Sequence, residues 1–234
     1  MTTSADFILA LADLVPGAHP VSAADLLAKQ NRAIARAMAE HSKHRPRKVT
    51  EDVDGTGAFD YALSELAGWA DGFSVVSQVE YPVDDTDEDA DVLDAADWAV
   101  YDKPAGKYLR FLSGAPQTGE TFRVAYTGRH TCTALACTVA AADIEAVESL
   151  AAGYLARMLT AVYALDQDSS LNADSIFNGS KTKRFAELAA AYAAEYNDHM
   201  GIQPGKPAPA CVTADWDVNY PGGADRLTHP RRSR

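Results

Sequence analysis

Apolar residues recur at helical spacing at both ends of the chain and alternate with polar residues in its middle. The N-terminal pattern predicts a short helix over residues 4–14 and a longer helix that begins after Ser22 and ends before Pro46. Ser22 is a good N-cap, and proline cannot continue a helix. The predicted apolar stripe of the longer helix consists of Ala24, Leu27, Ile34 and Met38.

The period changes to two from about residue 48 to residue 131, which is typical of strands. In the segment TFRVAYT, Phe122, Val124 and Tyr126 share one face, as expected for an antiparallel sheet with one solvent-facing side. We therefore predict a β-rich subdomain, either a small sandwich or a rolled meander. The other strand-like segments are VTEDV, AFDYALSEL, FSVVSQVEYPV, WAVYD and KYLRFL.

Helical spacing returns after residue 140. The sequence predicts a helix to Leu165, a loop over 166–180 and a second helix that ends at Gly201. The stripe of the first helix consists of Ile144, Val147, Leu150 or Ala151, Tyr154 or Leu155, Met158, Val162 and Leu165. The stripe of the second consists of Phe185, Leu188, Tyr192 and Tyr196.

These patterns predict an α+β fold with a helical bundle, an inserted antiparallel β-subdomain and an extended C-terminal arm. The N-terminal helices fall in residues 1–47, and the C-terminal helices that complete the bundle fall in 132–200. The β-subdomain occupies 48–131 between them. The arm is 201–234, which is rich in proline and glycine and lacks any period.

The net charge and the number of cysteines limit the classes of protein to which the chain can belong. The chain has 234 residues and a formal net charge of -12, which argues against a general nucleic-acid binder. Cys132, Cys137 and Cys211 are too few and too irregularly spaced for a disulfide framework, so we expect reduced thiols in a cytosolic product. No apolar run is long enough for a membrane span, and the first residues carry acids where a signal peptide has basic residues.

An acidic run, DDTDEDADVLDAADW, covers residues 84–98 and looks most like a chemical site. Alignment to a calcium loop with Asp85 at the first position leaves Ala90 where glycine is needed and Ala96 where a bidentate glutamate is needed. A solvated loop between two strands is therefore favoured over a dedicated calcium site. An acidic docking surface remains an alternative.

The remaining candidates for chemistry lack partners in the sequence. His41 and His44 share a helix end with Lys43 and Arg45, and these cations disfavour a metal, so we predict a solvated basic helix end. Contact of this end with an acidic neighbour, such as the 84–97 loop of another subunit, is an alternative. His130 could act in catalysis, but no nucleophile stands beside it.

The spacing of Cys132 and Cys137 fits neither a redox motif nor a zinc motif, so we expect both to be buried as small apolar side chains. The segment GIQPGK is one residue short of a phosphate loop and is followed by Pro207. We therefore predict no catalytic residue, no bound metal and no cofactor.

The C-terminal arm has an unusual composition for a tail. Trp216, Val218 and Tyr220 alternate, and aromatic side chains of this size normally find a pocket. The chain ends in HPRRSR, a local positive charge on an acidic protein. We expect the arm to dock on another subunit or another protein, for example as an added strand, with a plain flexible tail as the alternative. The predicted interface residues are Trp216, Val218, Tyr220, Arg231, Arg232 and Arg234.

The order of these segments resembles the head–tail connector (adaptor) and neck subunits of tailed bacteriophages. The resemblance covers about residues 5–200. It is carried by the helical start, the later alanine-rich helix and four quoted segments: FSVVSQVEYPV, DWAVYDKPAGKYLRFL, GETFRVAYTGRH and SKTKRFAELAAAYAAEYNDHMG. The smaller members of this family lack a β-region of this size.

The resemblance implies a structural protein of the virion neck, made in the host cytoplasm. It would form a ring, commonly of twelve subunits, between the portal protein and a downstream neck or tail protein. DNA would pass through the channel without sequence-specific binding, and an acidic wall would not trap it. No membrane is implied. The alternatives are another tail or baseplate structural protein, or an enzyme whose site combines scattered residues such as the acidic loop and His130.

Overall fold

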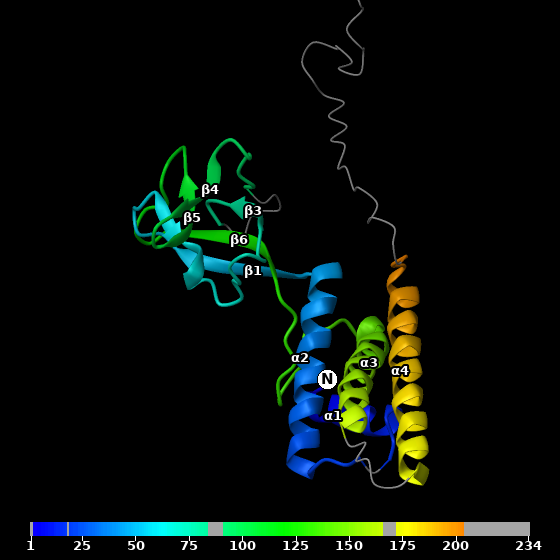
Figure 1. The fold of residues 1–234 in the computed structure, drawn as a ribbon. Coiled ribbons are helices and arrows are strands. Elements are labelled where there is room, and N and C mark those ends of the chain that lie inside the picture. Colours follow the sequence, from blue (N-terminus) through cyan, green and yellow to red (C-terminus); the bar gives the residue numbers. More distant parts are fainter. Residues whose placement is uncertain (1, 18, 84–90, 166–171, 204–234) are drawn as a thin grey trace, which may run out of the picture.

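The computed structural model describes residues 2–17, 19–83, 91–165 and 172–203, which form a helical part and a β-rich part (Figure 1). The helices are α1 (Ser4–Leu14), α2 (Ala23–His44), α3 (Ile144–Leu165) and α4 (Asn172–Met200). The strands are β1 (Arg47–Asp54), β2 (Asp60–Ala62), β3 (Val76–Glu80), β4 (Trp98–Lys103), β5 (Gly106–Phe111) and β6 (Thr121–Gly128). Two 3-10 turns are η1 (Leu63–Glu65) and η2 (Ala141–Asp143). The mixed α and β class predicted from the sequence is confirmed.

Helix α3 is the centre of the helical part, because it packs on α1, α2 and α4 (Figure 1). The first two helices start as the sequence predicts. Thr3 forms a capping box with Asp6, and the Ser22 side chain accepts a hydrogen bond from the Asp25 amide. The core between the helices is built mainly from aliphatic and aromatic side chains. Its fully buried large members include Phe7, Leu11, Leu155, Leu159 and Tyr196.

Parts of the predicted helical stripes are wrong. Leu27 is 46% exposed in α2 and Leu165 is 88% exposed in α3. In α3 the buried positions step by four from Leu155 to Leu159 and Tyr163, so the predicted Met158 and Val162 lie at the edge of the core. An apolar stripe on a helix advances by three or four residues at each step, so the same sequence allows two alternative stripes. Packing in the structure buries the stripe that was not predicted.

The loop predicted over 166–180 is also wrong for its second half, because α4 already begins at Asn172. Polar residues and Gly179 suggested a loop. A single glycine in a helix is unfavourable by only about 1 kcal/mol, and extension of an existing helix adds a hydrogen bond for every residue fixed. The helix therefore continues through this segment.

The β-rich part consists of two antiparallel three-stranded sheets, ordered β1-β6-β3 and β2-β5-β4. Phe122, Val124 and Tyr126 on β6 are each 1% exposed, which confirms the predicted buried face. The Phe111 and Phe122 rings are 5.1 Å apart and join the cores of the two sheets. Within the predicted strand AFDYALSEL only Asp60–Ala62 is extended, and η1 follows it.

The β-rich part is tied to the end of α2. Only Arg45 and Pro46 separate α2 from β1, and β6 leads back toward α2 before the chain enters α3 (Figure 1). The two crossings of the chain therefore lie at the same end of the helical part. Among the helices in the described ranges, none has the length and apolarity that a membrane crossing requires.

Candidate functional site: a buried histidine–aspartate network

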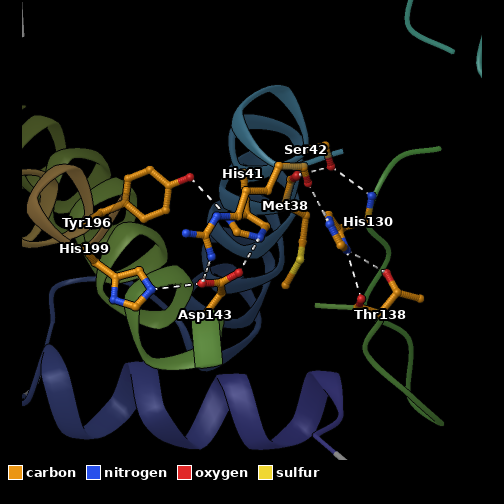
Figure 2. A network of polar contacts seen from close by, with 9 residues as sticks. Met38, His41, Ser42, His130, Thr138, Asp143, Tyr196 and His199 are labelled. Carbon is orange, nitrogen blue, oxygen red and sulfur yellow. Dashed lines mark hydrogen bonds and ion pairs between the residues drawn. The ribbon is translucent and has the colours of Figure 1, made fainter. Parts of the chain in front are cut away.

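Asp143 is the centre of a polar network between the helices (Figure 2). It ends η2 immediately before α3, and the residue is only 3% exposed. Its Oδ1 accepts hydrogen bonds from Arg45 Nη1 at 2.5 Å and His199 Nε2 at 2.9 Å. Its Oδ2 lies 3.8 Å from His41 Nε2. One carboxylate thus meets groups from the ends of α2 and α4.

The helix dipoles explain this arrangement. The negative C-terminal ends of α2 and α4 carry His41, Arg45 and His199, and cations or proton donors are favourable there. The N-terminal end of α3 is positive, and Asp143 supplies a negative charge at that end. The side-chain charges of the network therefore complement the partial charges of the three helix ends.

His41 is buried in the network rather than solvated. It is 0% exposed, which corrects the predicted solvated basic helix end. Burial, with the nearby His130, lowers the pKa of His41 from 6.5 to about 4, because a buried imidazolium loses its hydration. The ring is therefore neutral at neutral pH. His44 and Lys43 do lie at the surface and pair with Glu40.

Tyr196 contacts the His41 ring at the nitrogen that faces away from Asp143. Its hydroxyl lies 3.3 Å from His41 Nδ1, and burial raises the pKa of this tyrosine to about 12. Tyr196 and Asp143 therefore flank the His41 ring at its two different nitrogens. The distance of 3.8 Å between His41 Nε2 and Asp143 Oδ2 is too long for a hydrogen bond, and Nε2 has no hydrogen-bond partner among the described residues.

The pKa of Asp143 reflects two opposed effects. Burial alone would raise it, because a carboxylate loses its hydration. The hydrogen bonds from His199 and Arg45 act in the other direction and prevail, so the pKa of Asp143 lies below its usual value. The carboxylate is ionised at neutral pH and can balance the positive charge of Arg45.

His130 attaches the segment after β6 to the end of α2 (Figure 2). Its backbone amide donates to Ser42 Oγ at 2.9 Å, and Ser42 Oγ donates to the Met38 carbonyl at 2.6 Å. The imidazole lies 2.9 Å from the Arg45 carbonyl and 3.0 Å from the Thr138 carbonyl. The rings of His130 and His41 have centroids 5.1 Å apart, so the attachment continues into the network.

The arrangement is suited to joining elements. A histidine beside a carboxylate can act in general acid–base catalysis, but such catalysis requires contact with a substrate. His41 and Asp143 are almost fully enclosed. Within the part of the chain that the structure describes, no group of three or more His, Cys, Asp and Glu side chains could hold a metal ion. The network joins the ends of α2 and α4 to the start of α3, and His130 connects it to the segment after β6.

The predicted interface residues lie outside the described residues: Trp216, Val218, Tyr220, Arg231, Arg232 and Arg234. So do Cys211 and residues 84–90 of the acidic run. The rest of that run places Val92 opposite Glu80 in a β-bridge and leads into β4 at Trp98, where a calcium-binding EF-hand would need a helix. Cys132 and Cys137 are half-buried instead of buried.

Sequence reasoning missed Asp143, Tyr196 and His199 as members of one site. The sequence does place Asp143 just before a helical stripe, where an acid is favourable. It contains no signal that pairs this residue with His41 or His199, because the three lie in different segments. Comparisons of the chain with known protein families and with curated proteins found no match.

Proposed function

We propose that the chain is a structural subunit of the head–tail connector of a tailed bacteriophage. It would form a ring, commonly of twelve copies, between the portal protein and a downstream neck or tail protein in the virion. The proposal rests on the order of helices, β-region, helices and aromatic arm in the sequence. It is further supported by the surface of the helical part, which offers faces that another polypeptide can cover.

The outer face of α4 is the structural feature that best suits a contact between subunits. Four exposed alanines lie on that face and recur at helical spacing: Ala186, Ala190, Ala191 and Ala194. A neighbouring helix can approach closely where side chains are small, since less side-chain volume separates the two backbones. Large apolar side chains also stand exposed on the other three helices, with Leu9 66%, Leu27 46% and Leu165 88% exposed. In the proposed ring, contacts between subunits would bury these apolar side chains.

In the proposed ring, α4 of one subunit packs beside a helix of the next subunit. The arm with Trp216, Val218 and Tyr220 reaches the portal or an adjacent subunit, where its aromatic rings bury area. Arg231, Arg232 and Arg234 give the arm a positive charge that suits an acidic partner surface. The net charge of -12 keeps the channel wall from trapping DNA as it passes.

Native mass spectrometry and electron microscopy of the purified full chain test this proposal, alone and with a portal protein. We expect closed rings in at least one of these samples. Ala194→Glu should abolish them, because it places charge and volume in the helix contact. Thr118→Glu adds the same charge at an exposed position of the β-rich part and should leave the rings intact.

A wild-type chain that stays monomeric alone and with the portal would contradict the proposal. Rings that survive Ala194→Glu would place the subunit contact elsewhere than α4. Another tail or baseplate structural protein remains the second candidate, since it needs the same assembly surfaces but has different neighbours. An enzyme built around the acidic loop and His130 would instead show stoichiometric binding in a calcium or zinc titration.

A further inference from the structure

The segment between β6 and α3 contains a short antiparallel pairing of its own. The Thr138 amide donates to the Thr131 carbonyl at 2.9 Å, and the Thr133 amide donates to the Ala136 carbonyl at 2.9 Å. These two bonds flank a β-bridge in which Cys132 lies directly opposite Cys137. The two cysteines therefore occupy a non-hydrogen-bonded pair of an antiparallel ladder.

This kind of pair has the geometry that a disulfide needs. Its Cα atoms are typically about 4.5 Å apart, and both side chains project from the same face of the ladder. Disulfides span Cα separations of about 4.4–6.8 Å. The two side chains are free thiols, and each is half-buried, so small reagents can reach them. Burial and the adjacent Cys137 thiol raise the pKa of Cys132 to about 12.

We propose that Cys132 and Cys137 form a modification site, at which a small-molecule disulfide such as oxidised glutathione converts the two thiols into a cross-strand disulfide. The inference concerns this chain alone and does not depend on the proposed function. It replaces the expectation that both cysteines serve only as small apolar side chains.

The exchange proceeds in two steps. One cysteine loses its proton and attacks a sulfur of oxidised glutathione, which breaks that S–S bond and releases one glutathione thiolate. The second cysteine then loses its proton, attacks the protein sulfur of the mixed disulfide and expels the second glutathione. The two protons end on the two glutathione molecules, so two protein thiols are oxidised and one glutathione disulfide is reduced.

The cross-link would fix the attachment of the N-terminus. The Cys137 amide donates to the Thr2 carbonyl at 2.9 Å, and the Ser4 amide donates to the Thr133 carbonyl at 2.9 Å. The paired segment therefore holds the start of α1. A cross-link that closes so short a loop should raise Tm by about 5 °C, because it removes conformations mainly from the unfolded chain.

The test uses the full chain with Cys211→Ser, and the same background with Cys132→Ser or Cys137→Ser. Each reduced protein is incubated with defined ratios of reduced to oxidised glutathione, trapped with N-ethylmaleimide and analysed by intact mass and peptide mapping. We expect the two-cysteine chain to lose two hydrogen atoms and to yield linked peptides. Each single-cysteine chain should instead retain one glutathione.

The decisive control is the same measurement on the chain unfolded in urea. The equilibrium constant for the disulfide should be at least about tenfold larger in buffer than in urea, because the ladder holds the thiols together. Equal constants in the two conditions would overturn the proposal. So would a folded chain in which both cysteines carry glutathione, a folded chain in which both are alkylated even at the most oxidising ratio, or a wild-type chain in which Cys211 forms the link.

Discussion

Nε2 of His41 lies 3.8 Å from Oδ2 of Asp143, and both side chains are almost completely buried. The carboxylate is satisfied by other donors, Arg45 and His199, and the imidazole is fixed by Tyr196 on its opposite nitrogen. Removal of one partner of a buried ion destabilises the folded state, whereas an exposed ion pair contributes little to stability. The contribution of this network to stability should therefore depend on Asp143 far more than on any exposed ion pair.

Asp143→Asn tests this dependence. The substitution keeps the shape of the side chain but removes the charge that balances Arg45 and accepts from His199. We expect the free energy of unfolding, measured by urea denaturation, to fall by about 2 kcal/mol. Hydrogen bonds to a buried ion are weakened, while Arg45, whose side chain is 51% exposed, can be hydrated. Asp52→Asn is the matched control, because Asp52 also pairs with an arginine, Arg123, but is 49% exposed. Asp52→Asn should lower the free energy of unfolding by less than about 1 kcal/mol. Equal decreases for the two variants would contradict the assigned role of the network.

The sequence predicted elements better than it predicted this site, for a physical reason. Alternation along β6 and the cap at Ser22 are local signals that packing did not override. The network joins residues as distant as His41 and Tyr196, 155 positions apart, and only the fold brings them together. No pattern in the neighbourhood of either residue specifies such a contact.

His41 is an instructive error, because a signal for its burial was present. The prediction gave weight to its cationic neighbours Lys43 and Arg45. His41 also lies three residues after Met38 and seven after Ile34, so it continues their buried stripe. Helical phase outweighed local charge, and the exposed members of the same turn point away from that face.

Stability should fall in mild acid because of His41. The unfolded chain protonates this histidine near pH 6.5, while the folded chain resists protonation until about pH 4. Between these values the unfolded state binds more protons, so the free energy of unfolding decreases as pH falls, by up to about 3 kcal/mol. The lowered pKa of Asp143 adds a loss in the same direction at still lower pH.

His41→Gln separates this effect from other titrations. Urea denaturation at a series of pH values between about 7 and 4 gives the slope for each protein. Glutamine does not titrate, so the slope should become shallower even if the variant is less stable throughout. His44→Gln is the control, since His44 is at the surface and pairs with Glu40. An unchanged slope in His41→Gln would show that other groups dominate the acid response.

Ser42 should be important for the attachment of the β-rich part. Ser42→Ala removes the acceptor of the His130 amide, a bond of 2.9 Å at a residue only 1% exposed. We expect a loss of about 1–2 kcal/mol in the free energy of unfolding and faster amide hydrogen exchange over residues 129–138. Ser77→Ala removes an exposed side-chain bond to the Ala125 carbonyl and is the matched control. Exchange that stays slow in Ser42→Ala would mean that the imidazole contacts of His130 suffice.

The contact between α3 and α4 should be most sensitive at Gly153. A Cβ atom at this position would lie 3.3 Å from the Ala189 carbonyl oxygen and 3.4 Å from Cβ of Tyr192, so the two helices pack against bare backbone there. Leucine would need space that the core does not have, and Gly153→Leu should lower the free energy of unfolding by about 1–3 kcal/mol or more. Ala161→Leu adds apolar volume at an exposed position of the same helix and should be nearly neutral in thermal denaturation. If both variants unfold at the wild-type temperature, α3 and α4 do not pack through this glycine, and the polar network at their ends would have to hold the helices together without it.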